Sequence, residues 1–237
     1  DAARVAGASA TGTPVQTVSS AVSGGTVTGL TASDALTLKT PSSSATLAMT
    51  VSDTAANLVT NLDALEAKVK AKSITALTIA TDPAASSKPV LSITAKQLTA
   101  DIDALNVLKG DFDLTVTAVA AADAAATAGK ADAILKSAGS LSAMSKIAIS
   151  DTSANISTNI SKIELAGAAG RIMSITVSDN KALVLSETQI LGSTNTLNAQ
   201  YTAPVKVEAT GVAAADTAKV QTAVNSHSSL SLTKESI

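Results

Sequence analysis

The polar and apolar positions of residues 51–65 follow two different periods. The first residues are typical of the end of a strand, and the later ones place apolar side chains at helical spacing: Leu58, Leu62 and Leu65. Ser52-Asp53 stands between the two patterns. Free amide donors at a helix start need an acceptor, so we predict that this pair caps the helix. The stretch therefore predicts a strand followed by a capped amphipathic helix.

The same pattern returns in residues 149–163. Asp53 recurs as Asp151, 98 residues later, and the apolar face is kept by three isoleucines: Ile156, Ile160 and Ile163. A second phrase, a strand that ends in an Ala/Ser-Asp turn, occurs three times. Its aspartates are 89 and 93 residues apart, and we predict that they too are caps: Asp34, Asp123 and Asp216. Two recurring phrases predict an internal repeat of roughly 95 residues.

Within each repeat, strand and helix patterns alternate. Strands are predicted at 73–80, 90–93, 171–178 and 183–185, and helices follow the caps, at 95–108, and from Asp123 and Asp216 onward. Strands that alternate with helices indicate βα crossovers and a largely parallel sheet. We expect an α/β fold in which stacked β-α units form an elongated, solenoid-like body. A compact doubly wound domain is the alternative, and a hairpin across the short loop 179–181 stays open.

The repeat divides the chain into four predicted parts. Residues 1–25, rich in Ala, Ser, Thr and Gly, predict a flexible or extended arm, and 26–45 a partial repeat. Residues 46–143 and 144–237 are the two repeats. The second ends in 230–237, which is similar to the start of another repeat strand.

Composition narrows the classes of function. The 237 residues are 46% hydrophobic but only 1% aromatic, which favours thin stacked layers over one large core. A net charge of −2 without a basic run gives no reason to expect nucleic acid. No apolar run approaches the roughly 18 residues of a membrane span, so we expect no membrane insertion. The chain has no Cys, which excludes disulfides and thiolate metal sites.

Candidate chemistry is sparse. The one histidine, His227, lies in a Ser-rich turn, and neither a nucleophile elbow nor a phosphate-binding loop occurs. We therefore predict a protein that is not an enzyme and has no cofactor. The best calcium candidates are Asp111 and Asp113. The carboxylate pairs are not kept in the second repeat, which argues against a repeated calcium site: Asp101/Asp103 become Ser193/Asn195, and Asp111/Asp113 become Gln200/Thr202.

Two asparagine pairs accompany the repeated helix, at i and i+4: Asn57/Asn61 and Asn155/Asn159. Half-buried amides need hydrogen-bond partners. We expect them to bond backbone groups of the neighbouring repeat.

Several phrases carry a resemblance to a known group of proteins. They are Ser52-Asp53-Thr54-Ala55-Ala56-Asn57-Leu58, Asn61-Leu62-Asp63-Ala64-Leu65, Leu91-Ser92-Ile93-Thr94-Ala95-Lys96-Gln97-Leu98 and Leu114-Thr115-Val116-Thr117. Together they resemble the Ala/Ser/Thr/Asp-rich repeats of large secreted bacterial surface proteins of the haemolysin or adhesin type. The second copy departs at Ser153, Ile160 and Glu187. The resemblance implies an extracellular location and a structural or adhesive role.

The sequence favours a non-enzymatic structural protein that assembles with copies of itself into a bacterial surface fibre or layer. The expected assembly interface joins open strands at the two repeat ends: Leu230, Leu232, Val27 and Leu30. The alternative is a spacer or adhesin module of a much longer secreted protein, with ligands bound elsewhere or on its loops. Surface glycans are a further expected partner, and a polysaccharide-active solenoid is a third reading.

Overall fold

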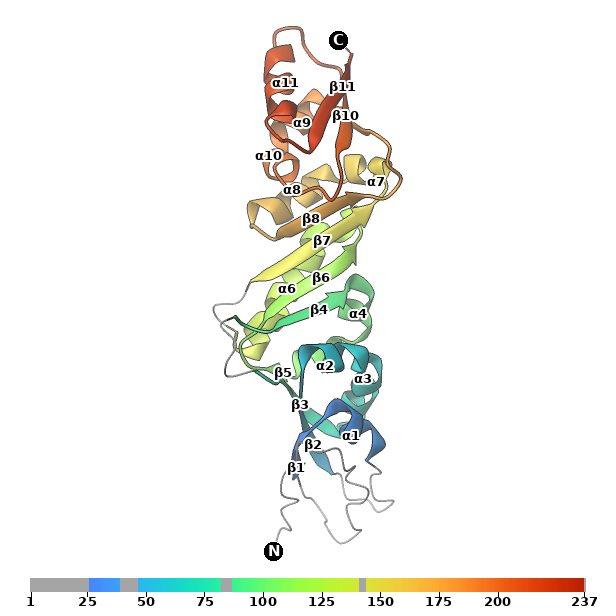
Figure 1. The fold of residues 1–237 in the computed structure, drawn as a ribbon, viewed down its shortest axis with the longest axis vertical. Coiled ribbons are helices and arrows are strands. Elements are labelled where there is room, and N and C mark those ends of the chain that lie inside the picture. Colours follow the sequence, from blue (N-terminus) through green and yellow to red (C-terminus); the bar gives the residue numbers. More distant parts are fainter. Residues whose placement is uncertain (1–25, 39–46, 82–86, 141–143, 237) are drawn as a thin grey trace, which may run out of the picture. The chain divides into compact units, whose positions relative to one another are not determined.

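The structure is a computed structural model that describes residues 26–38, 47–81, 87–140 and 144–236. The predicted arm, residues 1–25, lies outside these ranges. The chain forms two compact units (Figure 1). Unit 1 comprises residues 1–114 and 133–143, and unit 2 comprises residues 115–132 and 144–237. Each unit has its own buried side chains.

Unit 1 alternates strands with short helices. Its elements are β1 (Thr26–Leu30), α1 (Ala32–Thr37), β2 (Ala48–Asp53), α2 (Ala55–Thr60), α3 (Leu62–Lys70), β3 (Ile74–Ile79), β4 (Val90–Thr94), α4 (Ala95–Ala100), α5 (Ile102–Asn106) and β5 (Leu108–Lys109). Four strands form a sheet in the order β1-β2-β3-β5, and each neighbouring pair is parallel. Helix α1 connects β1 to β2, α2 and α3 connect β2 to β3, and α4 and α5 lie between β4 and β5, so parallel neighbours are joined by helical crossovers.

Unit 2 repeats this alternation. It holds most of β6 (Asp113–Val119) and α6 (Ala124–Ala138), and further η1 (Ala121–Asp123), β7 (Ser145–Asp151), α7 (Ser153–Thr158), α8 (Ile160–Ala168), β8 (Ile172–Val177), β9 (Leu183–Ser186), α9 (Glu187–Gly192), α10 (Thr194–Leu197), β10 (Val205–Thr210), α11 (Thr217–Asn225) and β11 (Leu230–Glu235). The strands β6, β7 and β8 are neighbours in one sheet, and β9, β10 and β11 in another. The pairs β7–β8, β9–β10 and β10–β11 are all parallel.

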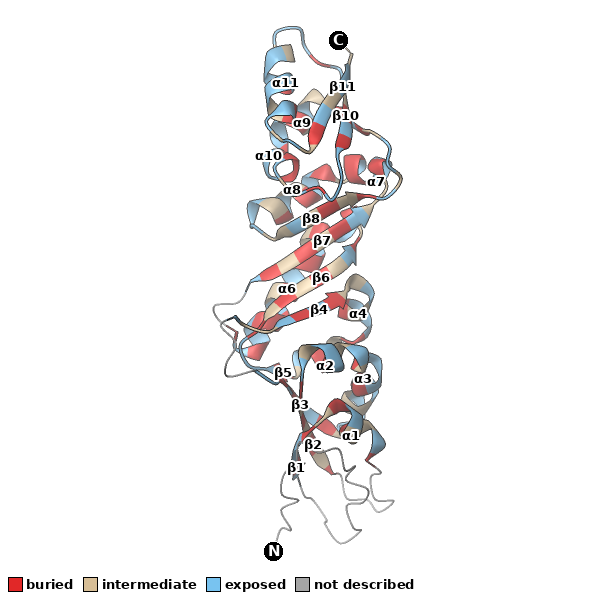
Figure 2. Ribbon diagram, in the orientation of Figure 1, coloured by how far each residue is buried: buried red, intermediate tan, exposed pale blue. Residues whose placement is uncertain are grey.

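The predicted α/β class with parallel sheets is confirmed. The hairpin alternative is wrong, because β8 and β9, which flank the short loop 179–181, belong to different sheets. Burial alternates along β2, β7 and β10, so one face of each of these strands packs inside and the other is partly buried or exposed (Figure 2). A doubly wound sheet is covered by helices on both faces. The observed one-sided burial therefore differs from the compact doubly wound alternative.

The predicted helices are present but broken. Asn61 separates α2 from α3 with φ −103° and ψ 10°, and Asn159 separates α7 from α8 in the same way. Each of these asparagines donates its Nδ2 to the carbonyl oxygen four residues earlier: Asn57 and Asn155. Such side-chain bonds compete with the helical ladder. The repeated asparagine thus marks a bend that the apolar spacing alone did not predict.

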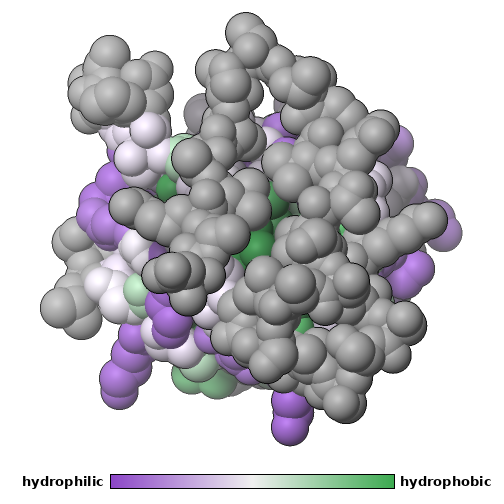
Figure 3. Space-filling model, turned by 90° about the horizontal axis from the view of Figure 1, so that it is seen from below, coloured by the Kyte–Doolittle hydropathy of each residue, from purple (hydrophilic) through white to green (hydrophobic). Residues whose placement is uncertain are grey.

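The interior is built almost wholly from Ala, Val, Leu and Ile. Both aromatic side chains are buried, and each is fixed by a hydrogen bond nearby: Phe112 N donates to Ser140 Oγ, and Tyr201 OH donates to the Thr196 carbonyl. Viewed from the side of β1, the described surface is mostly hydrophilic at its periphery (Figure 3). The packing of these aliphatic side chains positions the buried polar side chains of both units.

Candidate functional site

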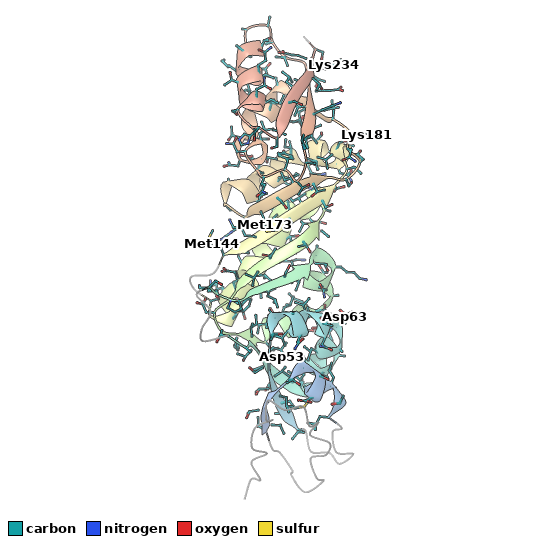
Figure 4. All side chains as sticks on the ribbon, viewed as in Figure 1. Asp53, Asp63, Met144, Met173, Lys181 and Lys234 are labelled. Carbon is teal, nitrogen blue, oxygen red and sulfur yellow. The ribbon has the colours of Figure 1, made fainter. Side chains whose placement is uncertain are left out.

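Asp53, at the end of β2 and labelled in Figure 4, accepts three hydrogen bonds. Its Oδ1 accepts from Thr54 N at 2.8 Å and from Asn57 Nδ2 at 2.7 Å, and its Oδ2 accepts from Ala32 N at 2.9 Å. The side chain is 8% exposed. The N-cap of α2 is therefore Thr54, one residue after the predicted pair, and its Oγ1 accepts from the Asn57 N–H. Asp53 instead accepts from the first residue of α1. We call this arrangement the aspartate clamp.

Unit 2 contains a second aspartate clamp with the same donors. Asp151 accepts from Thr152 N at 2.8 Å, Asn155 Nδ2 at 2.7 Å and Ala121 N at 3.0 Å. Burial alone would raise the pKa of Asp151, but these three hydrogen bonds outweigh it and lower the pKa. The carboxylate is thus held ionised by protein donors. A fully engaged acceptor of this kind fixes two elements to each other and has little capacity for a substrate.

The other predicted caps and amide contacts need correction. Asn57 and Asn61 bond groups within their own helix turn, not a neighbouring repeat. Asp34 lies in the first turn of α1, whose cap is Thr31. Asp123 lies in η1, for which Ala120 is the cap residue. Asp216 stands at the cap position of α11 but makes no side-chain cap bond, because its carboxylate pairs with Lys219.

A glutamate clamp, missed at the sequence level, joins helices within each unit. Glu164 in α8 accepts four hydrogen bonds from the start of α10: Asn195 N at 3.1 Å, Asn195 Nδ2 at 2.6 Å, Thr196 N at 2.8 Å and Thr196 Oγ1 at 3.0 Å. Glu66 in α3 accepts from Ala104 N in α5 at 2.6 Å and pairs with Lys70 at 3.0 Å. The two glutamates are 98 residues apart. The recurrence of a glutamate at this offset is the sequence signal from which the clamp could have been predicted.

A glutamine completes the set. Gln97 forms a capping box with Thr94 at the start of α4, and Gln189 forms one with Ser186 at the start of α9. The amide nitrogen of each then reaches a carbonyl oxygen of an earlier helix, Val59 in α2 at 3.4 Å or Ser157 in α7 at 2.8 Å. Each glutamine therefore links two helices that are more than 30 residues apart in sequence.

Unit 1 also contains a carboxyl pair without a counterpart. Asp101 is 2% exposed and lies beside the carboxyl group of Asp63. Burial, and then the neighbouring Asp63 carboxylate, raise the pKa of Asp101 to about 6. Unit 2 carries Ser161 and Ser193 at the corresponding positions. A raised carboxyl pKa can indicate an acid–base catalyst. Here the Asp101 carboxyl group is buried where α3 contacts α5. The carboxyl pair is therefore expected to affect the stability of unit 1.

One of the two calcium candidates, Asp111, already has partners for its carboxylate. Asp111 accepts from Lys88 Nζ at 2.9 Å and from Ser140 Oγ at 2.7 Å, and these two bonds lower its pKa. Asp113 begins β6, and its N–H donates to the Pro89 carbonyl at 3.0 Å. An ammonium group thus occupies the side of Asp111 that a cation would need. Over the described ranges, no group of three His, Cys, Asp or Glu side chains is placed to hold a metal ion.

The residues predicted for assembly lie at the first and last described strands. Val27 and Leu30 in β1, and Leu230 in β11, are buried, whereas Leu232 is partly exposed. The first three therefore pack inside their own units. His227 is partly exposed in the turn before β11.

No protein-family model, curated protein or solved structure matches this chain. In the part of the chain that the structure describes, no helix is long and apolar enough to cross a membrane.

We expect Asp151→Asn to destabilise unit 2 by about 1–3 kcal/mol, because an amide group would face donors on one side of the clamp. Urea unfolding followed by circular dichroism measures the change. Asp123→Asn is the control, because Asp123 is exposed in η1. Equal stability of Asp151→Asn and wild type would show that the clamp contributes nothing.

Proposed function

We propose that the chain is a non-enzymatic structural protein made of stacked β-α repeats, which forms an extracellular fibre or layer by joining copies of itself. The observation that carries the proposal is the recurrence of three polar clamps in two units. The aspartate, glutamate and glutamine of unit 1 each have a counterpart that bonds equivalent elements in unit 2: Asp53/Asp151, Glu66/Glu164 and Gln97/Gln189.

These clamps are what a stacked repeat needs. Each repeat buries an apolar face on its neighbour, and the backbone donors at the start of each short helix need acceptors as well. The aspartates and glutamates supply carboxylate acceptors from an adjacent element to those donors, and the glutamines donate to a carbonyl oxygen of an earlier helix. Their side chains are therefore committed to architecture, which favours a structural role over a catalytic one.

Self-assembly is supported by β11. Within the described residues, this strand has a hydrogen-bonded neighbour, β10, on one side only. An unpaired strand edge presents N–H and C=O groups that can pair with another chain. Parallel addition of one copy to the next is a head-to-tail contact, which extends into a filament when it does not close.

The alternative function is a spacer or adhesin repeat of a much longer secreted surface protein. The same clamps would stack such repeats within one chain, and the resemblance to large secreted repeat proteins favours this reading. The intact mass of the native protein separates the two. A mass of about 23.3 kDa supports an assembling subunit, and a much larger mass supports the spacer.

The assembly proposal is tested with Leu232→Pro. The Leu232 N–H bonds to Asn225 Oδ1 at 3.5 Å and points away from β10, so proline places a ring on the open edge of β11, where another strand would pair, and spares the β10 pairing. We expect wild type to form oligomers that grow with concentration, and the variant to remain monomeric, in light scattering and negative-stain microscopy.

Ala214→Pro is the matched control, because Ala214 is exposed in the turn before α11. It should assemble as wild type does. A wild-type protein that stays monomeric at every concentration would contradict self-assembly and leave the spacer reading.

A further inference from the structure

Unit 2 contains an open groove of about 690 Å³ along β9, β10 and α7. Its lining combines hydroxyl, amide and charged side chains with small apolar ones: Ser153, Ala154, Ser157, Thr158, Asn180, Lys181, Ala182, Val184, Lys206 and Glu208. We propose that this groove binds an acidic polysaccharide, one whose sugar units carry carboxylates. The proposal does not depend on self-assembly.

The first supporting observation is an unsatisfied hydroxyl. Ser157 is 8% exposed, and its Oγ has no hydrogen-bond partner within the described residues. Buried polar groups are almost always paired. The Oγ itself is closed to solvent, so a groove ligand that supplies the missing partner has to displace the lining beside it. Ser153, beside it, is already bonded to Asp179.

The second observation is the difference between the two repeats. The positions of Ser153 and Ser157 are occupied in unit 1 by Ala55 and Val59, 98 residues earlier. The neighbouring Asp151 is unchanged as Asp53 and makes the same bonds. The clamp is thus retained in both units, whereas the hydroxyl groups of Ser153 and Ser157 occur in unit 2 alone; the third lining hydroxyl, that of Thr158, has a counterpart in Thr60. A purely architectural surface gives no reason for that difference.

The third observation is charge. The ammonium groups of Lys181 and Lys206 both line the groove, and neither has an ion-pair partner among the described residues (Lys181 in Figure 4). With Glu208, the lining carries one net positive charge. Two ammonium groups can bind successive carboxylates, while the Glu208 carboxylate accepts from sugar hydroxyls.

The apolar part of the lining decides between a sugar and a peptide. Val184 is 50% exposed and is the one large aliphatic side chain of the groove. Peptide recognition usually relies on buried aromatic or aliphatic anchors that fill deep pockets. This open, hydroxyl-rich groove has none, and it suits a polyhydroxylated chain.

The test titrates the full-length protein, at low salt, with a trimer of galacturonate, and follows binding by NMR and calorimetry. A neutral galactose trimer and hexaglutamate are the comparison ligands. We expect the uronate trimer to bind at least tenfold more tightly than either. Binding should weaken as salt is added.

The groove variant is the double substitution Lys181→Gln/Lys206→Gln, and its control is Lys130→Gln/Lys162→Gln, which removes the same charge from exposed sites outside the groove. We expect at least a tenfold loss of affinity in the former and less than a twofold change in the latter. Ser157→Val, which introduces the residue of unit 1, should weaken binding severalfold without lowering the unfolding midpoint. The Leu232→Pro variant should bind as wild type does.

Equal binding by the groove and control variants, tighter binding of hexaglutamate, or no saturation with any ligand would overturn the proposal. Because Leu232→Pro should abolish assembly but still bind the uronate trimer, its binding affinity distinguishes a failure of this proposal from a failure of self-assembly.

Discussion

Glu164→Gln is expected to destabilise unit 2 by about 2–4 kcal/mol, because it replaces one oxygen of a fully used carboxylate by a donor. Two donors from Asn195 converge on Oε1, and two from Thr196 converge on Oε2. Whichever way the new amide turns, its NH₂ group faces one of these pairs. The start of α10 then loses its acceptor.

The effect should depend on pH. Burial raises the pKa of Glu164, but the bonds from Asn195 and Thr196 outweigh it, so that the folded-state pKa lies below its ordinary value. A depressed carboxyl pKa contributes stability above the unfolded-state pKa, and this contribution is lost as pH falls through the folded-state pKa. The gap between wild type and variant should therefore be full at pH 7 and narrow below about pH 4.

Hydrogen exchange of unit 2 amides, together with urea unfolding at several pH values, measures this prediction. Glu208→Gln makes the same chemical change in the half-buried side chain of β10 and should cost less than about 0.5 kcal/mol. If the two variants are equally stable, the glutamate clamp does not hold α8 to α10.

The order of strands and helices could be predicted from the sequence because it depends on local spacing. Leu58, Leu62 and Leu65 point inward as predicted, and all three are buried. The role of Asp53 could not be predicted in the same way. Its third donor, Ala32 N, lies 21 residues earlier and reaches the carboxylate only after β1 and β2 have paired. From residues close in sequence, a helix cap is the only role that can be predicted for the Asp53 carboxylate.

The recurrence of residues was more informative than their chemistry. Glu66 and Glu164 share the 98-residue offset, as do Asn61 and Asn159, and both pairs have matching roles in the two units. The Asp63–Asp101 pair is the opposite case. It occurs once, and it depends on contact between α3 and α5, so neither a motif nor a repeat pointed to it.

That pair gives the second large prediction: Asp101→Asn should stabilise unit 1 at pH 7–8 by up to about 3 kcal/mol. The folded-state pKa of Asp101 is about 6, against an ordinary value of 3.8. The folded state therefore binds a proton that the unfolded state releases between these two values. By linkage, the contribution of Asp101 to the stability of unit 1 is most favourable below about pH 4 and declines as pH rises through about 6. Asparagine supplies a permanent donor toward Asp63 and removes this loss.

Urea unfolding of wild type and Asp101→Asn from pH 4 to pH 8 tests the argument, with unit 1 amides followed by hydrogen exchange. The two proteins should converge near pH 4 and separate as pH rises. Asp101→Ser, which introduces the residue found at Ser193, should flatten the pH dependence in the same way because it also removes the titrating group. Asp103→Asn is the control, since Asp103 lies two residues away with its side chain half exposed. A wild-type stability that instead rises between pH 4 and 7, relative to both Asp101 variants, would show that Asp101 is ionised without cost and that the carboxyl pair does not share a proton.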